Sequence, residues 1–227
     1  MYIDKKEVLR YLGYHSKKID TITNEIIDTC IEEIKEIANF NYVYRIFPIE
    51  KKDKKIFLEG TSLIFESKNL YAHLLNSKKC ALLAVTLGNI VDQKIRYYSK
   101  INLSKSLIFD AVATTAIESI CDEIEENIKI IAKKYGLHIT NRYSPGYGDF
   151  PLSYQPKIIH LLDAQKKIGL TATPDFILIP RKSVTAIIGL EDKPSINKLS
   201  SCAKCSQNRT CIYKKDGDTC EYKKNNR

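Results

Sequence analysis

Arg142-Tyr-Ser-Pro-Gly-Tyr-Gly-Asp-Phe-Pro151 is the segment from which the fold of this chain is best interpreted. Pro145 and Gly146 predict a tight turn, and the glycines at 146 and 148 lack the Cβ atom that would keep a ligand away from the backbone. Arg142 adds a planar, permanently charged group suited to a carboxylate or phosphate, and Tyr147 adds a flat ring with one polar tip. The pattern is compatible with a ligand site, although an ordinary surface loop is the more common meaning of these residues.

Two further elements follow this segment. Residues 156–168 are predicted to form a helix, with Pro156 near its start and Gly169 ending it. Residues 171–180 and 183–189 are apolar and β-rich, and the Pro-Arg-Lys sequence between them predicts a hairpin.

Taken together, these elements resemble one family, the activation (S-adenosylmethionine-binding) domain of cobalamin-dependent methionine synthase. The resemblance rests on Arg142-x-x-x-Gly146-Tyr147-x-x-x-Pro151, on the Leu-Leu-Asp…Gly helix and on Pro180-x-x-Ser183-Val184…Gly189. The order and spacing of these elements over about fifty residues are more specific than any single motif. The chain is most similar to the small free-standing activation subunits of that family.

The resemblance implies a set of ligand-binding residues. Arg142 is expected to pair with the carboxylate of S-adenosylmethionine, and the Gly146-Tyr147 turn to supply backbone contacts and a ring wall. The intervening positions, where backbone carbonyls reach the ligand's amine, are Tyr143, Ser144 and Pro145.

Two acidic residues complete the candidate site. Relatives have an Asp-Ala…Glu helix near the cleft that faces the corrinoid, which makes Glu118 the candidate catalytic residue. The nearby acids Asp122, Glu123, Glu125 and Glu126 are interpreted as an exposed helix face. Asp149 is added from the residues alone, as a partner for positive charge on the ligand.

The resemblance also implies an activity and its partners. In this family an oxidised cob(II)alamin is repaired by one electron and a methyl group from S-adenosylmethionine, so the protein mainly positions the reactants. Neither a corrinoid-binding nor a homocysteine-binding module fits in 227 residues. Cobalamin is therefore expected on a separate methionine synthase or other corrinoid protein, with flavodoxin or ferredoxin as electron donor. The alternative is a non-catalytic binding or chaperone module for a corrinoid protein.

Two departures from the family pattern bear on the site. The large enzyme has a further ligand-contacting Tyr beyond the hairpin, where this chain has a Cys-rich tail. Its N-terminal acidic contact has no counterpart within residues 1–60. A partner chain is thus one way in which the site could be completed.

The composition changes near the end of the chain, and we divide it into an activation-like domain at 1–197 and a tail at 198–227. The tail contains four cysteines, and both zinc and iron–sulfur clusters take four thiolates as ligands. The spacing of these cysteines is standard for neither. A tail without metal is the third alternative. The predicted ligands are Cys202, Cys205, Cys211 and Cys220.

The remaining pattern predicts an α+β fold, an antiparallel sheet with long helices packed against it. Helices are expected at 19–39, 70–76, 90–98 and 104–135, strands at 41–48, 56–58 and 80–87, and a polar lead-in at 1–18. The strands are not followed by Gly-x-Gly-x-x-Gly, which disfavours a Rossmann-type methyltransferase.

Composition and charge narrow the function classes. The net charge of +9 fits an acidic protein partner, and the absence of a cluster of Arg and aromatic residues disfavours nucleic acid. Without a long apolar run or signal peptide, we expect a cytoplasmic protein with no membrane contact. The four histidines form neither a metal-binding doublet nor a Ser–His–Asp order, which gives hydrolysis little support.

Overall fold

The computed structural model describes residues 1–14 and 19–194. The predicted tail at 198–227, with its four cysteines, and the boundary at 197 lie outside the described residues. The strands are β1 (Asn41–Lys52), β2 (Lys55–Leu58), β3 (Ile64–Phe65), β4 (Ser77–Thr86), β5 (His138–Ile139), β6 (Thr171–Ala172), β7 (Leu178–Ile179) and β8 (Ser183–Glu191). The helices are α1 (Lys5–Tyr11), α2 (Thr21–Ile37), α3 (Lys68–His73), α4 (Asn89–Ile101), α5 (Leu103–Lys134), α6 (Gln155–Leu162) and α7 (Ala164–Ile168), with a 3₁₀ turn η1 (Leu152–Tyr154).

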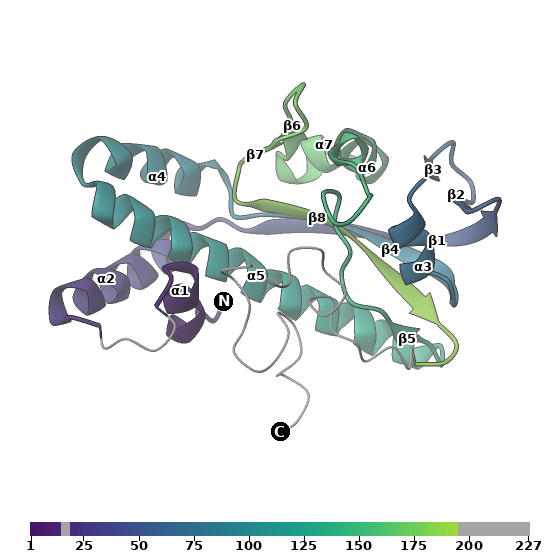
Figure 1. Cartoon of the computed structure of the whole chain (residues 1–227), viewed down its shortest axis with the longest axis horizontal. Coiled ribbons are helices and arrows are strands. Elements are labelled where there is room, and N and C mark those ends of the chain that lie inside the picture. Colours follow the sequence, from purple (N-terminus) through teal and green to yellow (C-terminus); the bar gives the residue numbers. More distant parts are fainter. Residues whose placement is uncertain (15–18, 195–227) are drawn as a thin grey trace.

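One antiparallel sheet organises the fold, with its strands in the order β3-β2-β1-β4-β8-β5. Helices α5, α1 and α2 lie on one side of it and α6 and α7 on the other (Figure 1). A separate two-stranded sheet pairs β6 with β7. The predicted α+β class is confirmed.

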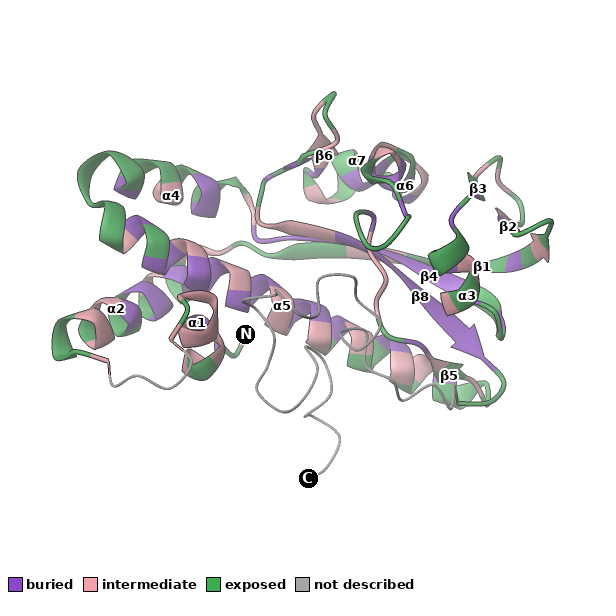
Figure 2. Ribbon diagram, in the orientation of Figure 1, coloured by how far each residue is buried: buried purple, intermediate pink, exposed green. Residues whose placement is uncertain are grey.

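Strand β4 is apolar and buried from Cys80 to Val85 because both of its faces are covered there, as the burial colours show (Figure 2). Successive side chains of a strand point to opposite faces. Leu83 and Val85 therefore enter the core shared with α1, α2, α4 and α5. Leu82 and Ala84 enter the core shared with α3, α6 and α7.

The helices follow from their sequence patterns. Asp20 caps α2 by accepting a hydrogen bond from the backbone N–H of Thr23, and Ile27, Ile31 and Ile34 bury one face of this helix. Asn102 caps the 32-residue α5 in the same way through Lys105. Despite that length, the described part of the chain contains no helix apolar enough to cross a membrane.

Three expectations were wrong in detail. The lead-in contains α1, which Asp4 caps and Val8 anchors in the core. The helix predicted at 156–168 is broken at Asp163, whose left-handed backbone (φ 54°) ends α6 and precedes α7. Strands β7 and β8 form no hairpin: β7 pairs with β6, whereas β8 pairs with β4 along its length and with β5 at its far end.

Three cysteines within the described part of the chain are free and buried, as the sequence predicts for reduced thiols. They are Cys30, Cys80 and Cys121. Burial raises the pKa of the Cys80 thiol to about 12, so this thiol stays protonated and unreactive at neutral pH.

Candidate functional site

The backbone of residues 140–143 runs along β8 and thereby aims the side chain of Arg142. Thr140 and Gly189 are joined by two hydrogen bonds, one through the Thr140 hydroxyl and one through its backbone N–H. Tyr143 and Ile187 exchange both backbone hydrogen bonds. Because neighbouring residues of an extended chain point in opposite directions, Arg142 turns toward α5 and Tyr143 turns toward the other face.

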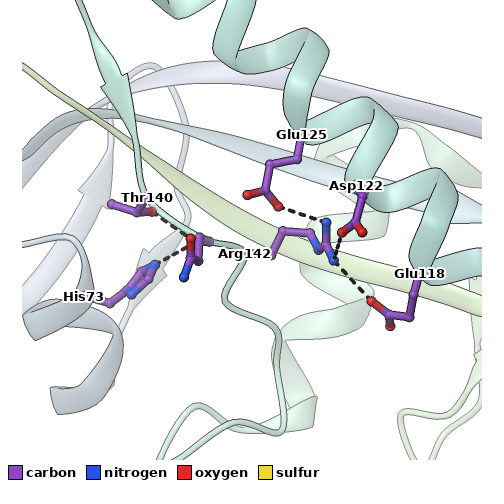
Figure 3. Close-up of polar contacts among 7 residues, drawn as sticks. His73, Glu118, Asp122, Glu125, Thr140 and Arg142 are labelled. Atoms are coloured by element: carbon purple, nitrogen blue, oxygen red, sulfur yellow. Dashed lines mark hydrogen bonds and ion pairs between the residues drawn. The ribbon is translucent and has the colours of Figure 1, made fainter. Parts of the chain in front are cut away.

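Three carboxylates of α5 surround the guanidinium of Arg142 (Figure 3). Its Nη1 donates to Glu125 Oε2 at 2.8 Å, and its Nη2 donates to Asp122 Oδ1 at 3.0 Å and to Glu118 Oε2 at 3.1 Å. Residues 118, 122 and 125 are spaced by four and three, so they share one face of the helix. The Arg142 side chain is 11% exposed, whereas those of its partners are 24% to 45% exposed.

The guanidinium of Arg142 is held firmly in its charged form. Burial works against its charge, but the three carboxylates outweigh that effect and raise the pKa of Arg142. Arginine carries five N–H donors, and the contacts with α5 use three of them. Two N–H groups therefore remain for a further acceptor.

The Pro-Gly turn has the predicted form. The N–H of Tyr147 donates to the carbonyl of Ser144 at 3.1 Å, which closes a turn with Pro145 and Gly146 at its centre. Gly146 has φ 98°, as the third position of a type II turn requires. Buried Phe150 anchors the far end of the loop, where its ring packs edge-on against Phe65.

Gly148 is required for a reason other than the predicted one. A Cβ atom at this position would lie 2.1 Å from the amide nitrogen of Asn69 and 2.8 Å from the Tyr143 hydroxyl. The missing side chain therefore makes room for the protein itself, and the expectation that it makes room for a ligand was wrong.

Asp149 lies at the N-terminus of α3. Its carboxylate accepts hydrogen bonds from the Ser67 hydroxyl and from the backbone N–H groups of Lys68 and Asn69. The bond from Ser67, followed by those from the two amides, lowers the pKa of Asp149. These hydrogen bonds to the start of α3 explain why a carboxylate occupies this position. Its contact with a cationic ligand stays a prediction.

Tyr143 also belongs to the α3 side of the loop. Its ring packs against His73 with the ring centroids 5.0 Å apart, and the His73 Nε2 contacts the carbonyl of Asn141 at 2.9 Å. Burial is the largest influence on His73 and lowers the pKa of its imidazole. These contacts fix the backbone beside Arg142 from the side opposite α5 (Figure 3).

A pocket of about 200 Å³ opens where the loop, α5, α6 and the start of β8 meet. It is smaller than the roughly 300–1,000 Å³ of most small-molecule sites, so a nucleoside ligand would extend beyond its rim. Its lining is partly charged and partly apolar, and the exposed ring of Tyr147 forms one wall. The lining residues are Glu118, Arg142, Ser144, Pro145, Tyr147, Gln155, Leu178, Ser183, Val184 and Thr185.

The structure thus brings together five of the predicted site residues, Glu118, Arg142, Ser144, Pro145 and Tyr147. The other lining residues from α6, β7 and β8 were missed as site residues, although the Ser-Val pair of β8 belongs to the motif that carried the family resemblance. Asp122 and Glu125 were also missed, and the interpretation of these two as a solvated face was wrong. Their helical spacing from Glu118 was the available signal.

The described residues contain no group of three or more His, Cys, Asp or Glu side chains that could hold a metal ion. The metal predicted for the tail stays a prediction, since all four of its ligands lie beyond residue 194.

Comparisons with known proteins agree with the fold. Neither the family models nor the curated proteins contain a match to this chain. A solved structure, the crystal structure of the MetH reactivation domain bound to AdoHcy, is similar over 83% of this chain and 70% of its own, with a TM-score of 0.58 and 15% sequence identity. At that identity the likeness shows the fold. The chain therefore has the fold of the methionine synthase activation domain, and the predicted fold is confirmed.

Proposed function

We propose that this protein binds S-adenosylmethionine in the pocket beside Arg142 and serves the reactivation of a cobalamin-dependent methyltransferase held on a separate chain. The observation that carries the proposal is a pocket built around a largely buried arginine side chain, in the fold of a domain that binds AdoHcy. When bound on its own protein, the corrinoid would supply the cobalt centre that accepts the methyl group.

The charges of the site suit an amino-acid ligand. The two remaining N–H groups of Arg142 can meet the ligand's carboxylate, and the carboxylate of Glu118, which is 45% exposed, can accept a hydrogen bond from its ammonium group. Glu118 places a negative charge in the lining of the pocket. A ligand that also carries a sulfonium suits that charge.

The residues of the pocket position the ligand and need not move a proton. The ring of Tyr147 and the side chains of Leu178 and Val184 offer apolar contact to a nucleoside. Glu118 thus has a binding role in this proposal, and its predicted catalytic role remains open to test. Methionine synthase as the partner, with a flavodoxin or ferredoxin as donor, completes the proposal.

Calorimetric titration of AdoHcy and S-adenosylmethionine tests the site. Wild type should bind both, and Arg142→Ala should bind about 2–3 kcal/mol more weakly, which is roughly 30- to 160-fold. Arg96→Ala, on the exposed face of α4, is the matched control and should bind as wild type does. Binding by wild type should be followed by a methyl-transfer assay with a corrinoid protein and a low-potential reductant.

A second candidate is a binding or chaperone module for a corrinoid protein without methyl transfer. The small pocket and the engagement of Arg142 with three carboxylates favour it. If wild type binds neither ligand even when the corrinoid protein is present, the result would favour this second function.

A further inference from the structure

Gln155 has a polar group that the protein leaves unsatisfied. This residue begins α6, lines the pocket and is 8% exposed. Its amide oxygen is buried and has no hydrogen-bond partner within the described part of the chain. Among the described residues, it is the one buried side-chain nitrogen or oxygen atom without such a partner. Buried polar side-chain atoms are nearly always hydrogen-bonded, so an unpaired one requires an explanation.

Packing does not explain a glutamine at this position. Methionine is equally long, also unbranched and similar in helix propensity, and it would fill the same space without an unpaired oxygen. The Gln155 oxygen has no protein donor to hold it, and the last torsion of a glutamine side chain is broad. Rotation of the amide can therefore present the oxygen to a ligand in the adjoining pocket.

We propose that the amide oxygen of Gln155 accepts a hydrogen bond from the exocyclic amino group of the ligand's adenine. The charged groups of the pocket, Arg142 and Glu118, suit the zwitterionic end of the ligand, which leaves the neutral amide for the neutral base. Glutamine pairs well with adenine because an amide matches the amino group and the adjacent ring nitrogen of this base. This inference rests on the proposed function and gives the pocket its preference for adenine.

The test compares AdoHcy with S-inosylhomocysteine, in which a carbonyl replaces the amino group, by calorimetry on wild type, Gln155→Met and Gln165→Met. Wild type should prefer AdoHcy by about tenfold or more. Gln155→Met should bind AdoHcy about five- to tenfold more weakly and lose the preference. Gln165, exposed on α7, provides the matched control, and its variant should behave as wild type does.

Two further measurements separate recognition of the base from a structural role. Without ligand, Gln155→Met should melt at the same temperature as wild type or higher, because it removes an unpaired buried oxygen. Gln155→Glu keeps an acceptor oxygen and should keep the preference for AdoHcy, so the inference stays testable even if the methionine variant does not fold.

Three results would overturn the inference. Gln155→Met that retains the full preference for AdoHcy shows that the base is read elsewhere. Suppose that Gln155→Met still prefers AdoHcy over S-inosylhomocysteine but no longer prefers it over an analogue without the α-amino group. Gln155 then contacts the amino-acid end of the ligand. Wild type that binds none of these ligands overturns the proposed function together with this inference, whereas the first two results leave the proposed function intact.

Discussion

The contacts of Arg142 with α5 should stabilise the folded protein even without ligand. Replacing Arg142 by Met removes the charge, keeps most of the apolar stem and leaves three acids on one helix face. The contact with Glu125 is the shortest and least exposed, so we assign it about 1–1.5 kcal/mol, and the two more exposed contacts about 0.5 kcal/mol each. Repulsion among the three acids adds a few tenths. The variant should therefore lose about 2–3 kcal/mol.

Urea denaturation at pH 7 measures this loss directly, and thermal melting should show a decrease of about 4–10 °C for a chain of this size. Glu125→Gln should lose about 1 kcal/mol of stability. Glu126→Gln is the control: the neighbouring side chain is more exposed, and this variant should stay within about 0.5 kcal/mol of wild type. In a double-mutant cycle, Glu125→Gln should cost little once Arg142 is Met.

The refuting result is an Arg142→Met variant whose stability lies within about 0.5 kcal/mol of wild type. The three contacts would then be surface pairs without net value, and Arg142 would be free to turn fully toward a ligand. A normal loss with no coupling between Arg142 and Glu125 would instead attribute the effect to the packing of the arginine stem.

Three further outcomes are expected. Leu82→Ala, at a fully buried position of β4, should lose about 2–5 kcal/mol in urea denaturation, and a loss below about 1 kcal/mol would contradict its place in the core. Asp149→Ala should lose about 1 kcal/mol at pH 7, because the backbone N–H groups of Lys68 and Asn69 lose their acceptor while Ser67 still caps α3. Because the pKa of Asp149 is lowered in the fold, the difference from wild type should vanish as the pH falls through and below the usual aspartate range. The pKa of His73 is also lowered in the fold, so its neutral form should stabilise the protein above pH ~6.5 and this contribution should decrease as the pH falls further. Melting curves from pH 8 to 5 should show a smaller acid-induced decrease for His73→Gln than for wild type.

Local chemistry made much of the fold predictable. The isoleucine spacing of α2, the apolar run of β4 and the Pro-Gly turn before Tyr147 each follow from rules that act over a few residues. The break at Asp163 does not follow from such rules, because the apolar pattern continues across it and only the backbone conformation changes. The pairing of β8 also depended on distant strands, so the sequence near the Pro-Arg-Lys turn favoured a hairpin that the sheet does not form.

The candidate site was predictable only in its local part. Ser144, Pro145 and Tyr147 line one pocket, because a tight turn brings them together whatever the rest of the chain does. The acids at 122 and 125 meet Arg142 only because residues 140–143 run along β8 on the side of α5. Gln155 carried no signal in its own sequence, since an unpaired amide can be recognised only when its surroundings are known.

Under the proposed function, the contacts that hold Arg142 in place also influence the choice of ligand. A guanidinium held by three acids presents its remaining donors in a fixed direction, so a ligand's carboxylate meets a group that is already ordered. Glu118 adds a negative charge to the lining of the pocket, which disfavours a ligand whose only charge is a carboxylate. S-adenosylmethionine adds an ammonium and a sulfonium to its carboxylate and so carries a net positive charge, whereas AdoHcy is neutral overall. Under the proposed function, the site should consequently bind S-adenosylmethionine more tightly than AdoHcy, and titration of both ligands into wild type measures the difference.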